Sequence, residues 1–79
     1  MKSGIVILKP GEEVGCHNTN SREELIIVLE GSAGIEIDDK QFEMISNNSV
    51  FYIPPETKHN IINRGEKILR YIYVVSPTD

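Results

Sequence analysis

Turn-forming residues interrupt this sequence at intervals of about 8–12 residues, so no stretch between them is long enough for a substantial helix. The segments between the turns are rich in β-branched and aromatic residues, which are typical of strands. The expected strands are residues 3–9, 24–30, 34–38, 40–45, 49–53, 58–64 and 67–75. This spacing predicts an all-β domain, a small antiparallel barrel or sandwich.

Two of these segments alternate strictly between apolar and polar residues. Residues 34–38 alternate two isoleucines with acidic residues, and residues 40–45 alternate Phe42 and Met44 with polar residues. Such alternation indicates one buried face and one wet face. We expect the following side chains to line the barrel: Phe51, Ile53, Phe42, Met44, Ile26, Val28 and Ile61.

Two other segments, residues 25–29 and 71–75, are apolar on both faces. A small barrel buries only one face of each strand, so the second face needs a second sheet or a partner subunit. At 79 residues the chain buries only ~60% of the surface that its unfolded form exposes. This marginal size favours the partner, and we predict a homodimer.

Composition narrows the class of protein further. Eight basic residues are scattered among twelve acidic ones and tryptophan is absent, which argues against nucleic acid as the main partner. No apolar run approaches the ~18–20 residues of a membrane span, and the N-terminal segment lacks the pattern of a signal peptide. With Cys16 as the only cysteine, we expect one cytoplasmic domain over residues 1–79, with no membrane partner.

Three residues are candidates for chemistry: His17, Glu24 and His59. Glu24 opens a strand on the same side as Ile26, and a carboxylate buried there without a partner would cost several kcal/mol. It therefore requires a cation or hydrogen-bond donors. Neutral imidazole and carboxylate are natural ligands for iron, manganese, nickel, copper or zinc.

The spacing around the first two candidates carries a resemblance. In "HNTNSREELIIVLEG", His17 is followed by Thr19, Glu24 and Gly31. This spacing resembles the first motif of the cupin superfamily, in which two histidines separated by one residue precede a glutamate and a glycine. Thr19 stands where the second histidine belongs.

The segment around the third candidate resembles the second cupin motif. In "NSVFYIPPETKHNIIN", Pro54, His59 and Asn63 hold the motif positions, while Asn48 and Glu56 stand where the motif has glycines. With the strands around them, the two segments cover residues 15–65, most of the chain. Matching spacings in both motifs are considerably more specific than either motif alone.

The resemblance implies a small single-domain cupin with a jelly-roll barrel and with His17, Glu24 and His59 as ligands of a divalent transition metal. Because Thr19 removes one histidine, two consequences stay open. The remaining set has the composition of the facial triad of non-haem iron oxygenases, with open positions for substrate. Alternatively, the metal is lost, as in non-catalytic sensor cupins.

Two functions follow, and the sequence does not choose between them. One is a metal-dependent enzyme acting on a small organic substrate; the other is a non-catalytic module that binds a sugar-like or other small molecule. Thr19, Asn63 and Phe51 are expected near the pocket, and Cys16 is expected to be a small buried side chain. Taken singly, each candidate ligand also has an ordinary structural interpretation, as a loop or surface residue.

Overall fold

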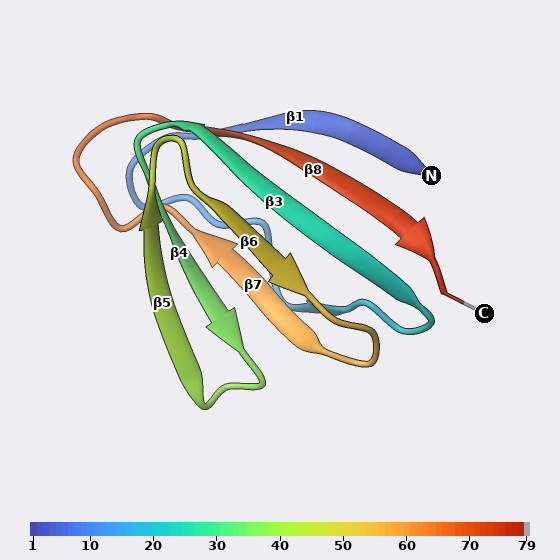
Figure 1. Cartoon of the computed structure of the whole chain (residues 1–79). Helices are drawn as coiled ribbons and strands as arrows, with labels where there is room; N and C mark the ends of the chain where they lie inside the picture. The colour runs from blue at the N-terminus through green and yellow to red at the C-terminus, as the bar shows by residue number, and fades with distance from the viewer. Residues whose placement is uncertain (79) are drawn as a thin grey trace.

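The computed structural model describes residues 1–78, which form eight strands in two four-stranded antiparallel sheets (Figure 1). The first sheet has the spatial order β1 (Lys2–Leu8), β8 (Leu69–Pro77), β3 (Arg22–Glu30) and β6 (Val50–Ile53). The second sheet has the order β2 (His17–Asn18), β7 (Lys58–Ile62), β4 (Ser32–Ile37) and β5 (Gln41–Ser46). The predicted all-β, jelly-roll class is therefore confirmed. No helix in the described part of the chain is long and apolar enough to cross a membrane.

The core lies between the inner faces of the two sheets. Ile26 and Val28 of β3 are almost fully buried there, as are Ile35 of β4 and Ile61 of β7. Full burial of one such side chain stabilises the fold by about 1.5–3 kcal/mol. These positions, together with Ile53, were expected inside from the sequence pattern.

The predicted inner positions on β5 are wrong. Phe42 and Met44 are 39% and 50% exposed, because the register of the β4–β5 hairpin pairs Phe42 with Glu36 on the outer face. Ile35 is buried, so its partner Glu43 shares the inner side. Phe42 and Met44 alternate with Glu43 and point out, while Ile45 packs against the core. Alternation identified the two faces of β5, but the pairing decided which one meets the core.

The junction between β3 and β4 requires the glycine of the first motif. Gly31 has a φ of +82°, and a Cβ there would press against the Ile68 carbonyl oxygen. Asn48 and Glu56, which replace motif glycines, keep positive φ values of 66° and 55°. The backbone of the second motif is therefore preserved although its glycines are not. Glu56 holds this conformation at a steric cost.

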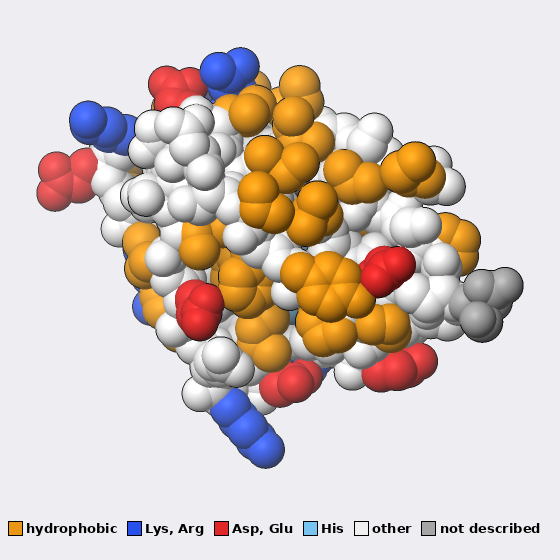
Figure 2. All heavy atoms as spheres, viewed as in Figure 1, with side chains coloured by type: hydrophobic (Ala, Val, Ile, Leu, Met, Phe, Trp, Pro, Cys, Tyr) orange, Lys and Arg blue, Asp and Glu red, His pale blue; other side chains and the backbone are white. Residues whose placement is uncertain are grey.

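The outer face of the first sheet is apolar across all four strands. Ile5, Ile72, Ile27 and Val50 form one row in register across β1, β8, β3 and β6. Ile5 and Val50 at its ends are 61% and 57% exposed. Figure 2 shows hydrophobic side chains gathered over this side of the molecule. We call these four residues, with Leu25, Tyr52 and Val74 of the adjacent row, the outer apolar face.

Candidate metal centre

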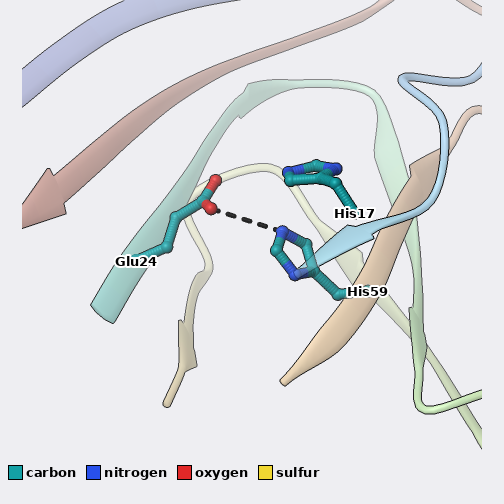
Figure 3. A group of neighbouring side chains, drawn as sticks. All are labelled: His17, Glu24 and His59. Atoms are coloured by element: carbon teal, nitrogen blue, oxygen red, sulfur yellow. Dashed lines mark ion pairs between the residues drawn. The ribbon is translucent and has the colours of Figure 1, made fainter. Parts of the chain in front are cut away.

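His17, Glu24 and His59 come together at one end of the barrel, from strands of both sheets (Figure 3). One ligand atom from each residue lies within 4.8 Å of the others. His17 of β2 pairs with His59 of β7, and their rings are 4.1 Å apart between centroids. Glu24 of β3 reaches them from the opposite sheet. The structure thus brings together all three residues that the sequence singled out.

Burial distinguishes the three side chains. The side chain of His59 is completely buried, and that of Glu24 is only 12% exposed. Glu24 shares the inner face of β3 with Ile26, as the alternation of the strand predicted. His17 is exposed and forms the solvent side of the group. The centre is therefore a deep acid–imidazole pair with one accessible histidine above it.

Both histidines use Nδ1 to contact a backbone carbonyl two residues earlier. His59 Nδ1 lies 3.2 Å from the Thr57 oxygen, and His17 Nδ1 lies 3.0 Å from the Gly15 oxygen. A carbonyl only accepts, so each Nδ1 carries the proton and donates it. In the neutral rings each Nε2 then keeps a free lone pair, which is the tautomer that binds metals through Nε2.

Nε2 of His59 is the one buried side-chain polar atom of residues 1–78 without a hydrogen-bond partner. It approaches Glu24 Oε1 at 3.3 Å, but without the alignment of a hydrogen bond. A neutral ring would direct its lone pair toward a carboxylate, and two acceptors at this distance repel each other. A cation relieves this conflict, either a proton on His59 or a metal ion between the two groups.

The pKa of His59 reflects this conflict. Burial by itself lowers the pKa, because it disfavours the charged ring. The Glu24 carboxylate and the Thr57 carbonyl favour the imidazolium, and together they raise the pKa above its usual value of 6.5. In the metal-free protein the raised pKa of His59 therefore favours the charged ring beside Glu24.

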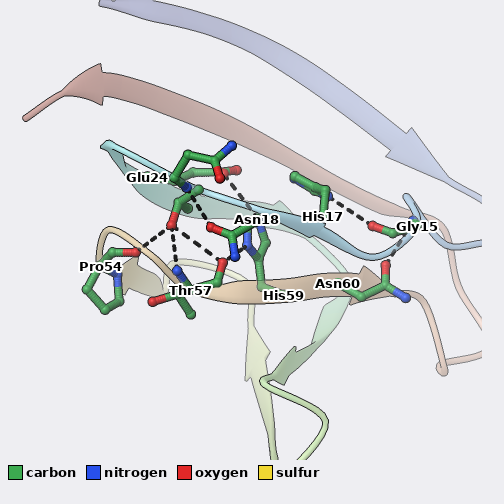
Figure 4. A network of polar contacts seen from close by, with 10 residues as sticks. Gly15, His17, Asn18, Glu24, Pro54, Thr57, His59 and Asn60 are labelled. Atoms are coloured by element: carbon green, nitrogen blue, oxygen red, sulfur yellow. Dashed lines mark hydrogen bonds and ion pairs between the residues drawn. The ribbon is translucent and has the colours of Figure 1, made fainter.

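The segment before β2 holds His17 in place through backbone contacts (Figure 4). Gly15 has a φ of +109°, and its N–H donates a 2.9 Å hydrogen bond to the side-chain oxygen of Asn60. Asn60 in turn donates to Glu13 at 2.8 Å.

Cys16, predicted to be a small buried side chain, is exposed, because it directly precedes β2, a two-residue strand at the edge of its sheet.

Thr19 has a structural place rather than a position among the candidate ligands. Its hydroxyl donates to the Pro54 carbonyl at 2.8 Å and accepts from the Thr57 N–H at 3.0 Å. The Thr19 N–H also donates to the Thr57 carbonyl at 3.1 Å. The residue that replaces the second motif histidine therefore ties the loop between β2 and β3 to the turn before His59.

The other two expected pocket residues, Asn63 and Phe51, make structural contacts. Asn63 is fully buried and donates to the carbonyls of Leu8 and Lys67, at 2.9 and 2.8 Å. Phe51 is partly buried against the core. Asn63 thus ties the end of β1 to the segment before β8.

A cavity of about 190 Å³ opens beside the candidate ligands. His17 and Glu24 contribute to its wall, and the rest is mostly aliphatic and aromatic. The lining residues are Val6, Val14, His17, Glu24, Ile61, Tyr71, Tyr73 and Val75. Three of them carry a signal in the sequence, because Tyr71, Tyr73 and Val75 alternate along one face of β8. Ile61 is the one lining residue among the side chains that the sequence pattern predicts inside the barrel.

His59 and Glu24 have the spacing of two ligands of a divalent metal ion, and His17 would have to move closer to complete the set. A metal with bonds of about 2.0–2.2 Å needs ligand atoms roughly 3–3.5 Å apart. His59 Nε2 and Glu24 Oε1 already meet this spacing at 3.3 Å, and the accessible His17 lies within 4.8 Å of both. The unpartnered Nε2 atom, the Nδ1 contacts and the buried carboxylate all agree with a metal site.

The comparison with known families agrees with the fold and the motifs. The family model described as "Cupin domain" matches residues 4–75, so the chain belongs to the cupin family. The chain is 28% identical over 74 residues to polyketide synthase CurC of Streptomyces cyaneus. It is 34% identical over 73 residues to the mannose-1-phosphate guanylyltransferase RfbM of Salmonella typhimurium. These matches cover 94% and 92% of the chain, but only 47% and 15% of the two relatives.

Solved structures share the fold at low sequence identity. A predicted oxalate decarboxylase from Thermotoga maritima superposes with a TM-score of 0.89 at 23% identity, over 95% of this chain and 64% of that one. The cupin domain of Schizosaccharomyces pombe Cnp3 superposes with a TM-score of 0.87 at 21% identity, over 98% and 55%. At these identities the likeness concerns the fold alone.

Proposed function

We propose that this protein is a metal-binding cupin that holds one divalent transition metal ion through His17, Glu24 and His59, and that it binds or transforms a small organic molecule in the adjoining cavity. The observation that carries this proposal is the buried pair of His59 and Glu24, in which an unpartnered Nε2 faces a carboxylate at 3.3 Å. A metal ion bound there would act as a Lewis acid and would leave coordination positions open for a ligand.

The chain's own residues would then hold the metal-binding rings in place and select the kind of ligand that the cavity accepts. The Gly15 and Thr57 carbonyls fix the two rings in the metal-binding tautomer. The aliphatic walls of the cavity, including Val6 and Ile61, favour an organic molecule over a hydrated ion. Tyr71 supplies a phenol whose pKa burial raises further, so it stays protonated and can donate a hydrogen bond.

Relatives act in small-molecule metabolism according to their names, which include a polyketide synthase and a sugar-nucleotide enzyme. They support a small organic ligand but do not select a reaction. The second candidate function is a binding module without metal. The fastening of Thr19 to the Pro54–Thr57 turn favours it, because this position cannot supply a fourth ligand.

We further propose that the protein works as a homodimer joined through the outer apolar face. Four strands about 4.8 Å apart and up to nine residues long give the sheet face a flat area of roughly 500 Å², without the area that the side chains add. The uneven surface of the side chains adds to this flat area and brings it toward the ~800 Å² per partner of a standard interface.

A cytoplasmic location remains the prediction made from the sequence.

Metal analysis of protein purified without an affinity tag tests the main proposal. We expect about one iron, manganese, nickel, copper or zinc ion per native chain, and none in His59→Ala. A native protein that folds, lacks metal and takes up none on titration would refute it in favour of the metal-free module. Circular dichroism of His59→Ala shows whether a loss of metal merely reflects loss of the fold.

A further inference from the structure

Two cationic side chains, Lys2 and Arg22, lie on the inner side of the first sheet, next to the candidate metal centre. Lys2 of β1 pairs with Val75 of β8, and Val75 pairs with Glu24 of β3. Arg22 precedes Glu24 by two residues on β3. Paired residues, and alternate residues along a strand, share one face of a sheet, so all four side chains belong to the inner face.

A second cavity occupies this end of the barrel. It has a volume of about 320 Å³ and is lined by Met1, Lys2, Arg22, Val75 and Pro77. Val75 also lines the 190 Å³ cavity that contains His17 and Glu24. The two cavities therefore share Val75 as a lining residue.

Among residues 1–78, Arg22 has no carboxylate partner, unlike the other two arginines. Arg64 lies 4.0 Å from Glu36, and Arg70 lies 3.4 Å from Glu30. Within residues 1–78, neither Arg22 nor Lys2 forms an ion pair. A guanidinium that is free of carboxylates and lines a cavity is well suited to bind a carboxylate or phosphate in a bidentate manner.

We propose that the ligand of the candidate metal centre carries a second anionic group, a carboxylate or a phosphate, that Lys2 and Arg22 bind. This inference rests on the proposed function and names its ligand class. Arg22 is about 7 Å from Glu24 along β3, and Lys2 is about 10 Å from it across two strand spacings. The ligand is thus a short organic molecule with an oxygen donor at one end, an anion at the other, and a spacer that passes Val75.

Calorimetric titrations with paired probes test this assignment on cobalt-loaded protein. Adipate and hexanoate have the same six-carbon chain but differ by one terminal carboxylate, and glucose 6-phosphate and glucose differ by a phosphate. We expect native protein to bind, in at least one pair, the probe with the additional anionic group about fivefold or more tightly than its matched partner, as one added ion pair predicts. The preferred pair identifies the anionic group.

The double variant Lys2→Gln/Arg22→Gln should lose this preference, with the ratio falling toward one. The matched control Lys67→Gln/Arg70→Gln removes the same charge away from the second cavity and should keep it. Equal affinities within both probe pairs in native protein, or an unchanged ratio in the first double variant, would overturn the proposal. The same ratios measured on metal-free protein test the cationic pair separately, so failure of the metal site is distinguishable from failure of this inference.

Discussion

Replacement of Thr19 by valine tests whether this position has become a structural fastening. Valine keeps the shape of the side chain but removes the hydroxyl that donates to Pro54 and accepts from the Thr57 N–H. The Thr57 N–H belongs to a buried residue and would lose this acceptor. A buried donor without a partner costs about 1–3 kcal/mol.

We therefore expect Thr19→Val to lower the free energy of unfolding by about 2 kcal/mol. For a domain of this size that corresponds to a fall in Tm of about 8–16 °C. Differential scanning calorimetry at one fixed protein concentration measures it, because a dimer would make Tm depend on concentration.

Thr78→Val is the matched control. Its hydroxyl makes a single exposed hydrogen bond to the Ser21 carbonyl, so its loss should change stability by less than about 0.5 kcal/mol. If Thr19→Val melts within the range of this control, the hydroxyl does not fasten the turn and the structural explanation of the missing histidine fails.

Three further predictions concern the dimer, the strained turn and pH. Ile5→Glu/Val50→Glu should halve the mass seen by sedimentation equilibrium while Met44→Glu, equally exposed but on β5, leaves it unchanged; a native monomer would refute the interface. Glu56→Gly should raise the free energy of unfolding by about 0.5–1 kcal/mol in urea titrations, since it relieves a positive φ, and a loss of stability would contradict this. Because the folded-state pKa of His59 is raised, its contribution to the stability of the metal-free protein should be complete below pH 6.5 and should disappear as pH rises through that raised pKa. Metal affinity should increase over the same pH range. Denaturation at several pH values should show the stability trend in native protein and not in Glu24→Gln.

The sequence predicted what depends on local pattern and on motif spacing. Turn residues and alternation predicted the all-β class and the inner positions of β3, and the two motifs selected His17, Glu24 and His59, which the fold brings together. The prediction for the inner positions of β5 failed because it depended on how the strands pair. The outward position of Phe42 follows from its register with Glu36, which no period within β5 can encode.

The cavity was harder to foresee than the candidate ligands. Its walls combine residues from β1, β3, β7 and β8, and the sequence order does not show that β1 and β3 lie on either side of β8. The same pairing brings Lys2 and Arg22 to one end of the barrel. The role of Thr19 required the turn at Pro54–Thr57 to be seen in three dimensions, because a threonine in a ligand position predicts only a missing ligand.

The most direct test of the central claim is a calorimetric zinc titration of Glu24→Gln beside Glu23→Gln. The two variants remove the same charge from neighbouring residues, but Glu23 lies on the exposed face and contacts Tyr52. If the metal lies between His17, Glu24 and His59, Glu23→Gln should bind one zinc ion with native affinity, and Glu24→Gln should bind it at least about 100-fold more weakly. Equal zinc affinity in the two variants, or no zinc binding by the native protein, would contradict the account.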